Sequence, residues 1–528
     1  MANTARGRVI ALALFATWLG VVLFAARNHA VWRDEVRALS VALHGDNAVA
    51  MLRGIHGEGH PALWYLLLRG GHALVARPEI LQIVALIVAS AAVLLLLLRS
   101  PFSWPLLALF LAGNLFLFEY SVMARNYGIS MLLLFLLAAF YERHRDRGPL
   151  LGILLLLLAN CSAHSVLLVG AFLLFWLVDI TTGDSTHRPG TLRVFMFNAA
   201  IATLGVAICI LTIFPVHDAL VIEKPHSGAL TLFFKAVVLP AARFPVSVRG
   251  LPKSAMEYLS IWKDPYILIV DLLMSLVMFG STLGLVRRPA AFVSALAALV
   301  GMSLFFAFVY RAEYRHEALW LAFLICCYWI AGAKARQPEP EPPTLLKTLV
   351  RTVSRVGCAM FLLLFAIQVP IGIFNISAAV GSDPPFSRSR DLGSLVAGRP
   401  DLKDATIIAD PDNLVESLPY YLPNRTYLIR EQRFGKTVIF TQKARLRISL
   451  NDILVTACGL RSKLGKPVVI LMAQRLDPSA PPQRFREAYN WDLTTTPEQV
   501  RTFLASTRLI KRFAPAITDE SFDVYLLN

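Results

Sequence analysis

The chain has 528 residues, of which 56% are hydrophobic and only 16% charged, and its mean hydropathy is +0.59. Soluble proteins carry about 25% charged residues, so these values exclude an ordinary cytosolic enzyme, a disordered chain and a collagen-like chain. The net charge of +16 is spread along the sequence, without the basic tail that is typical of nucleic-acid binding. The six cysteines form no Cys-x-x-Cys pair, so their spacing indicates neither a disulfide framework nor a zinc site.

Apolar runs dominate the first 375 residues, and a helix needs about 20 residues to cross a hydrocarbon core. Eleven runs are predicted to span, with their flanking residues where they are short: 8–27, 79–98, 104–119, 127–141, 149–162, 164–180, 192–214, 264–286, 289–310, 316–333 and 345–374. The first lacks a cleavage site of small residues, which predicts a retained signal anchor. The stretch 61–76 starts at Pro61 and carries Arg69 and His72, so we expect a helix that lies on the membrane surface.

Basic residues set the expected orientation. If the N-terminus is cytoplasmic and 61–76 does not cross, the Arg143–Arg147 cluster and the other short basic loops face the cytoplasm, as the positive-inside rule requires. We therefore expect a multi-pass membrane protein whose C-terminus lies on the outer side of the membrane. The expected domains are a membrane domain, 1–379, with outer loops 28–78 and 215–263, and a soluble domain, 380–528.

The sequence after residue 380 has an ordinary soluble composition. Short strands are predicted at Ala405–Asp410, Thr426–Arg430, Val438–Thr441 and Pro467–Met472, with a helix at Leu450–Leu464 and a terminal hairpin at 508–513 and 522–527. Strands that alternate with helices predict a small α/β domain. No glycine-rich nucleotide loop is present in it, so we assign no nucleotide chemistry.

Polar residues that are unusual near a membrane gather on the expected outer side. Five outer loops contribute Asp34, Glu35, Glu58 and His60; Glu119, Arg125 and Tyr127; His164; His217; and Arg311, Tyr314 and Arg315. Carboxylates, arginines and histidines that converge from separate loops are typical of an active site, here one at the membrane surface.

Each group also has a structural interpretation. The acidic pair Asp34-Glu35 is compatible with a helix cap, and Pro61 with a helix entry. Arg125 and Tyr127 are common interface anchors. Arg311 and Arg315 are one helical turn apart, a spacing compatible with ion pairs to nearby carboxylates.

The Asp34-Glu35 pair after the first span, followed by Glu58-x-His60-Pro61 before a surface helix, resembles the GT-C glycosyltransferases. These multi-span enzymes include the protein O-mannosyltransferases and the lipid A aminoarabinose transferase. The resemblance covers roughly residues 8–375 by the order of spans and loops, and Arg125-Asn126-Tyr127 after Glu119 resembles a form common in bacterial members. A single proline follows His60, and the lysine of the aminoarabinose type is missing, so neither named substrate is implied.

The resemblance implies a mainly α, polytopic membrane helix bundle of GT-C type with an extracytoplasmic α/β domain. It implies transfer of a sugar from a polyprenyl-phosphate donor, with inversion, to a lipid, glycan or protein acceptor at the outer face of the bilayer. In this interpretation Asp34 is the general base. Glu35 and Glu58 orient the acceptor, or they hold a divalent cation together with Asp34; no other cofactor is expected. The leaving phosphate is bound by Arg125, Arg311 and Arg315, with hydrogen bonds from His60 and His164.

Two other classes of protein remain as alternatives. A ligase or polymerase of polyprenyl-linked glycans shares the lipid-phosphate site and differs in requiring a longer lipid-linked donor. A transporter or flippase is expected to show internal repeats and polar residues at the bilayer midplane, which this sequence lacks. For the C-terminal domain, binding of the acceptor or of a partner protein and a passive covering role both stay open.

Overall fold

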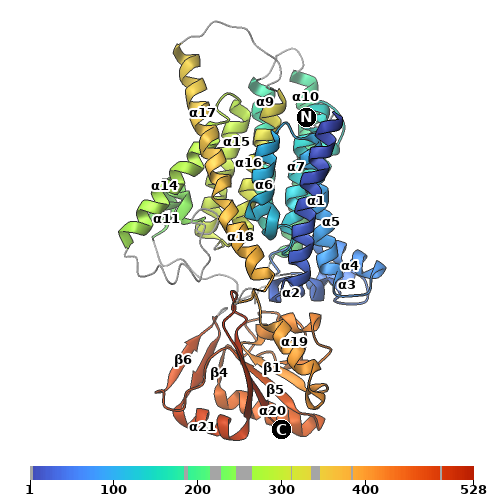
Figure 1. Cartoon of the computed structure of the whole chain (residues 1–528), viewed down its shortest axis with the longest axis vertical. Coiled ribbons are helices and arrows are strands. Elements are labelled where there is room, and N and C mark those ends of the chain that lie inside the picture. The colour runs from blue at the N-terminus through green and yellow to red at the C-terminus, as the bar shows by residue number, and fades with distance from the viewer. Residues whose placement is uncertain are drawn as a thin grey trace.

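Two bodies stacked along the long axis make up the molecule (Figure 1): a helical bundle and, below it, a domain built on β-sheets. The computed structural model describes residues 4–56, 58–182, 188–214, 228–244, 264–310, 312–334, 345–381, 384–487 and 490–527. The N-terminus lies near the end of the bundle that is remote from the sheet domain. The mainly α bundle with a C-terminal α/β domain confirms the predicted fold class.

All eleven predicted spans contain helix. They correspond to α1 (Ala5–Asn28), α5 (Ile80–Arg99), α6 (Trp104–Ala112) with η1 (Leu115–Glu119), α7 (Tyr127–His144), α8 (Leu150–Ala159), α9 (Ala163–Thr182), α10 (Arg188–Ile213), α14 (Asp264–Leu283), α15 (Pro289–Phe308), α16 (Tyr314–Lys334), and α17 (Leu345–Ala366) with α18 (Gln368–Ala379). Within the described ranges, seven helices are long and apolar enough to cross a membrane, counting α17 and α18 as one.

The predicted span 104–119 is broken in the middle. Helix α6 ends at Ala112, and the chain continues as a short π-helix, η1, that ends at Glu119. Helix α18 passes at the break, where Gly113 faces Gln368 and Asn375 Nδ2 donates a hydrogen bond to Asn114 Oδ1 at 2.8 Å. Short π-helical segments are frequent at functional sites, and here the segment delivers Glu119 to the end of the bundle.

Three short helices lie at the end of the bundle that faces the sheet domain: α2 (Arg33–Ala42), α3 (Ala48–Gly54) and α4 (Ala62–Leu74). Helix α4 corresponds to the predicted surface helix 61–76. Its 13 residues extend over only about 20 Å at 1.5 Å per residue, which is too short to cross a bilayer. A further short helix, α11 (Ala229–Val238), packs against α15.

The C-terminal domain contains a mixed six-stranded sheet in the order β3-β2-β1-β5-β9-β8 and a second sheet in the order β4-β7-β6. The strands are β1 (Thr406–Asp410), β2 (Thr426–Leu428), β3 (Arg433–Phe434), β4 (Arg447–Ser449), β5 (Val468–Met472), β6 (Gln483–Arg486), β7 (Asp492–Thr495), β8 (Arg508–Phe513) and β9 (Phe522–Leu527). The helices are α19 (Ser389–Ala397), α20 (Leu450–Leu464), α21 (Pro497–Ser506) and the 3₁₀ segment η6 (Asp412–Tyr420). Strand β1 is parallel to β2 and β5, whereas β9 is antiparallel to β5 and β8.

Most of the strands predicted in this domain are confirmed, as are helix 450–464 and the terminal hairpin. The strand predicted at Val438–Thr441 is wrong, because its backbone bonds to side chains: Val438 N donates to Glu416, and Val438 O accepts from Arg37. The strand predicted at Thr426–Arg430 ends early at Leu428, because Asp412 accepts hydrogen bonds from the next two backbone N–H groups.

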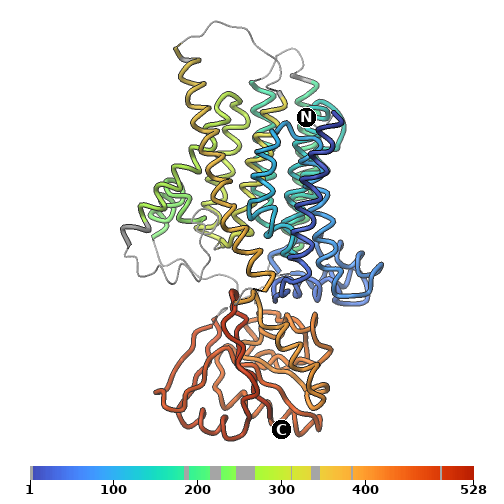
Figure 2. The backbone as a smooth tube through the Cα atoms, in the orientation of Figure 1, coloured from blue at the N-terminus to red at the C-terminus, as the bar shows by residue number. Residues whose placement is uncertain are grey.

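The two bodies are joined by polar and aromatic contacts at the level of α2. Segment η6 packs against α2, and the Tyr421 hydroxyl donates to Val31 O at 2.8 Å. Arg390 donates to the carbonyls of Asn28 and His29 at the end of α1. Figure 2 shows the chain running from α18 directly into the sheet domain beside the start of α2. The C-terminal domain therefore rests on the segment that carries the predicted acidic pair.

Candidate active site

Helix α2 begins with the two predicted acids. Asp34 and Glu35 lie in its first turn, where negative charge is favoured by the exposed backbone N–H groups. Successive residues of a helix point about 100° apart, so the two carboxylates face different surroundings. The predicted cap is present, because Glu35 Oε2 accepts from Trp32 N at 3.1 Å.

Asp34 is surrounded by three arginines, its neighbour Arg33 and two from distant parts of the chain. Its Oδ2 lies 3.1 Å from Arg125 Nη1 and 3.0 Å from Arg315 Nη2, and its Oδ1 lies 3.6 Å from Arg33 Nε. Arg125 follows η1 and Arg315 opens α16, so the fold brings three elements together here. Arg33 also pairs with Asp519 at 3.0 Å, so three guanidinium groups face two carboxylates, which leaves an excess of positive charge. We call Asp34, Arg33, Arg125 and Arg315 the arginine cluster.

The arginine cluster sets the charge of Asp34. Burial by itself raises the pKa of this carboxyl, but Arg125, Arg315 and Arg33 together lower it below its usual range. Asp34 is therefore ionised at neutral pH, and the arginines that hold it also make it a weak base. The side chain keeps 20% of its surface exposed, so it stays accessible from outside.

Histidines and aromatic rings line one side of the arginine cluster. Arg125 Nη2 donates to His60 Nε2 at 3.1 Å, and the ring of Tyr127 meets His60 edge-on. Burial, and next the charge of Arg125, lower the pKa of His60 well below its ordinary value, so the ring is neutral. His164 stacks on His316 with 4.4 Å between ring centroids. His316 was not predicted as a site residue.

Several buried polar atoms around the cluster have no hydrogen-bond partner among the described residues. They are His164 Nδ1 and Nε2, Arg315 Nε and Trp32 Nε1. Buried polar groups in proteins are nearly always paired. A concentration of unpaired donors beside excess guanidinium charge is typical of a site that binds a polar, anionic ligand.

Glu35 points away from this cluster and is fully buried. Its carboxylate lies 2.9 Å from His29 Nε2 and accepts from Ala124 N at 2.7 Å, in addition to the bond from Trp32 N. Ala124 directly precedes Arg125. Through these contacts Glu35 ties the start of α2 to the loop that carries Arg125, and its catalytic role stays a prediction.

Glu58 lies apart from Asp34 as well. Both of its oxygens bind Arg37, at 2.5 and 3.1 Å. Among the described residues, which include all three predicted acids, no three His, Cys, Asp or Glu side chains come together as metal ligands do. The possible metal site of Asp34, Glu35 and Glu58 is therefore not formed, because each carboxylate is held by a different partner.

The remaining predicted residues divide into three groups. Glu119 is buried at the end of η1, with Arg315 and Arg125 as its nearest opposite charges. Tyr314 is directed away from the cluster and donates to Gln368 Oε1 of α18 at 2.8 Å. His217 and Arg311 lie outside the described residues.

A set of charged residues at the domain boundary was not among the predicted site residues. They are Arg33 and Arg37 on α2, and Glu416, Asp519 and Glu520 in the C-terminal domain. The i,i+4 spacing of Arg33 and Arg37 indicated that both lie on the same face of a helix. The three acids lie almost 400 residues or more from α2 in sequence, so no local pattern indicated them.

The fold and the site together define a membrane-type helix bundle with an arginine-rich site at one end, against a sheet domain. No family model matches the chain, and no curated protein matches it. Among solved structures it is similar to the crystal structure of ArnT from Cupriavidus metallidurans in the apo state. The match has 13% identity, covers 98% of each chain and has a TM-score of 0.43.

Proposed function

We propose that this protein is an integral membrane glycosyltransferase of GT-C type, which uses a polyprenyl-phosphate-linked sugar as donor. The observation that carries the proposal is the arginine cluster, an ionised carboxylate among three guanidinium groups at one end of an apolar helix bundle. Guanidinium groups bind phosphate through paired hydrogen bonds. The apolar bundle supplies a surface for a polyprenyl chain, and the carboxylate supplies a base for an acceptor hydroxyl.

In the proposed reaction the donor phosphate replaces Asp34 as the partner of Arg125 and Arg315. Asp34 then loses two of its ion pairs, its basicity rises, and it removes the proton of the acceptor hydroxyl. The acceptor oxygen bonds to C1 of the sugar from the side opposite the phosphate, and the bond from C1 to the phosphate oxygen breaks. The configuration at C1 inverts, and the polyprenyl phosphate leaves with its charge held by the arginines.

This exchange of partners explains why a base is placed among arginines. A carboxylate of very low pKa transfers protons poorly, and a positioned base contributes typically about 10²–10⁴-fold in rate. Because the same arginines serve Asp34 and the phosphate, the base becomes effective only when a donor is bound. The neutral ring of His60 and the unpaired nitrogens of His164 are then available for hydrogen bonds to phosphate or sugar oxygens.

The placement that we propose is the inner membrane of a bacterium, with the arginine cluster and the C-terminal domain on the outer side. The acceptor is a lipid, a glycan or a protein with a free hydroxyl or amine. Asp34, Arg125 and Arg315 are the residues that touch the reacting groups, with His60 and His164 beside them.

The test is a comparison of cell-envelope glycolipids and glycans by mass spectrometry in a deletion strain, complemented with wild-type protein or with Asp34→Asn. We expect one sugar modification to disappear in the deletion strain and to return only with the wild type. Loss of a whole lipid-linked oligosaccharide product favours the ligase or polymerase class. An unchanged envelope profile rejects the proposal.

A further inference from the structure

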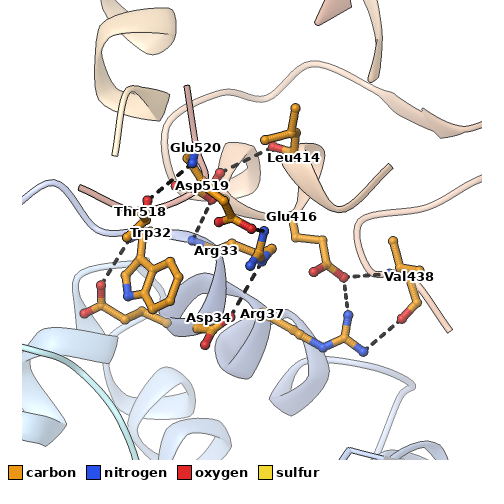
Figure 3. A network of polar contacts seen from close by, with 12 residues as sticks. Trp32, Arg33, Asp34, Arg37, Leu414, Glu416, Val438, Thr518, Asp519 and Glu520 are labelled. Carbon is orange, nitrogen blue, oxygen red and sulfur yellow. Dashed lines mark hydrogen bonds and ion pairs between the residues drawn. The ribbon is translucent and has the colours of Figure 1, made fainter. Parts of the chain in front are cut away.

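Helix α2 has two charged faces that contact different bodies of the molecule. Asp34 faces Arg125 and Arg315 of the membrane domain. Arg33 and Arg37, one turn apart, face the C-terminal domain (Figure 3). The base of the proposed reaction therefore sits on a short helix that is held from the other side by a separate domain.

Arg33 is held by the loop between the last two strands. Asp519 Oδ2 accepts from Arg33 Nη1 at 3.0 Å, and Glu520 Oε1 accepts from the backbone N of Arg33 at 2.9 Å. This N–H group is in the first turn of α2, where helices leave donors without partners. Glu520 is fully buried and supplies the missing acceptor at the helix start.

Arg37 joins three segments of the chain. Its guanidinium forms an ion pair with Glu416 of η6, binds Glu58 at 2.5 Å, and donates to Val438 O at 2.8 Å. Glu416 is almost fully buried and also accepts from Val438 N at 2.7 Å. Val438 thus contacts both members of the Arg37–Glu416 pair. Removal of one member of such a buried pair leaves an uncompensated charge.

From these contacts we infer that Glu416, Asp519 and Glu520, which we call the C-terminal carboxylates, position Asp34 for catalysis. The C-terminal domain then has a third role, in addition to the two that the sequence left open, acceptor binding and a passive cover. It holds the helix that carries the proposed base. The three carboxylates touch no reacting atom, and they act through the orientation of α2. The inference rests on the proposed function for the role of Asp34, but the coupling of the domain to α2 stands independently of it.

Hydrogen–deuterium exchange of the purified full-length protein tests the coupling directly. The variants are Glu520→Ala, Glu520→Gln, Glu416→Gln and Asp519→Asn, with Asp401→Asn as the control, because Asp401 pairs with Arg399 in an exposed ion pair of the same domain. We expect exchange of the α2 amides to rise about tenfold or more in Glu520→Ala, as for loss of a hydrogen bond to a charged acceptor. Glu520→Gln should restore most of the protection, because its amide oxygen still accepts from Arg33 N.

Global destabilisation is separated from positioning by the pattern of exchange. Positioning predicts faster exchange in 33–42 with unchanged protection of β5, whereas general destabilisation raises exchange throughout the domain. If Glu520→Ala fails to fold, Glu416→Gln and the half-exposed Asp519→Asn decide the question. Unchanged exchange of α2 in these variants overturns the inference.

A kinetic comparison completes the test. Positioning predicts a lower kcat for Glu416→Gln and Glu520→Ala, with affinity for undecaprenyl phosphate within about twofold of wild type, because Arg125 and Arg315 belong to the membrane domain. If the wild-type protein has no transferase activity but α2 exchanges faster in the variants, the coupling of the domain to α2 is retained and the proposed function is rejected. If Asp34→Asn abolishes transfer but the carboxylate variants leave the exchange of α2 unchanged, the proposed function is retained and the coupling of the domain to α2 is rejected.

Discussion

Two clusters of arginine and carboxylate in this protein have opposite compositions. In the arginine cluster, one carboxylate, Asp34, faces three guanidinium groups. In the core of the C-terminal domain, a single fully buried guanidinium, that of Arg430, lies 2.8 Å from Asp410 Oδ1 and 3.0 Å from Glu487 Oε2. Guanidinium groups outnumber carboxylates in the first cluster, and carboxylates outnumber guanidinium groups in the second.

The two clusters also differ in how their charge is balanced. Burial raises the pKa of both Asp410 and Glu487, so a proton offsets the second carboxylate. Arg430 further donates to the backbone carbonyls of Leu446 and Asp492 and lies over the ring of Trp491. That cluster is internally compensated and structural. The arginine cluster keeps its excess charge near the surface of α2, which is what an anionic ligand requires. The structural role of the Arg430 cluster and the proposed ligand-binding role of the arginine cluster therefore differ because of the balance of charge, and less because of the number of charged residues.

The largest expected effect is on transfer, from Asp34→Asn. Loss of the base should lower the rate by about 10²–10⁴-fold. Undecaprenyl phosphate should bind at least as tightly as to wild type, because Arg125 and Arg315 lose a competing partner. Transfer assays and equilibrium binding on the purified variant measure both, with Asp401→Asn as the matched control. Transfer at the wild-type rate would remove Asp34 from the base role.

The second prediction breaks the structural cluster. Arg430→Ala leaves two carboxylates buried without their partner, which costs about 3–5 kcal/mol in comparable cases. We expect the C-terminal domain to unfold at a clearly lower temperature, as followed by circular dichroism or differential scanning fluorimetry. Arg315→Ala is the contrast, because Asp34 retains Arg125 and Arg33 and thermal stability should change little. Equal destabilisation by both variants would contradict the distinction between the clusters.

The third prediction concerns the anion site itself. Arg315→Ala removes one charged hydrogen-bonding partner, worth about 1.5–3 kcal/mol, and should weaken binding of undecaprenyl phosphate by about 10–100-fold. Arg315→Lys should recover only part of the affinity, because an ammonium group cannot bind two oxygens in a fixed plane. Isothermal titration in detergent micelles measures this. An unchanged dissociation constant for Arg315→Ala would count against a phosphate site here.

The smallest expected effect is a dependence of stability on pH. Burial raises the pKa of Glu520 from an ordinary value near 4.5 to about 7. The folded state therefore favours the protonated acid, and this stabilising contribution, complete at low pH, is lost as pH rises through about 7. Glu520→Gln cannot ionise, so its Tm relative to wild type should increase between pH 5 and pH 8. A constant difference in Tm across this range would show that Glu520 does not titrate there.

The comparison of sequence and structure shows which features were predictable. Each apolar run contains helix because hydropathy is a local property, although only seven helices of the described residues are long and apolar enough to cross a membrane. The helix at 450–464 and the terminal hairpin were placed at their observed bounds. The convergence of Asp34, Arg125 and Arg315 was also expected, because the order of spans brings their loops to one face. The break in 104–119 was not predictable, because it arises where α18 packs against α6 and η1.

What the sequence by itself determined is therefore the apolar helical class of the bundle and the α/β class of the C-terminal part, and it predicted the loops that we propose form the site. Only the tertiary structure decided which partner each of the three carboxylates contacts. Asp34 faces the arginines, Glu35 is buried under the turn, and Glu58 is bound to Arg37. The physical reason is that hydropathy and helical period act over a few neighbouring residues. The partner of a charged side chain depends instead on burial and on groups hundreds of residues away, as the contact between Arg33 and Glu520 illustrates.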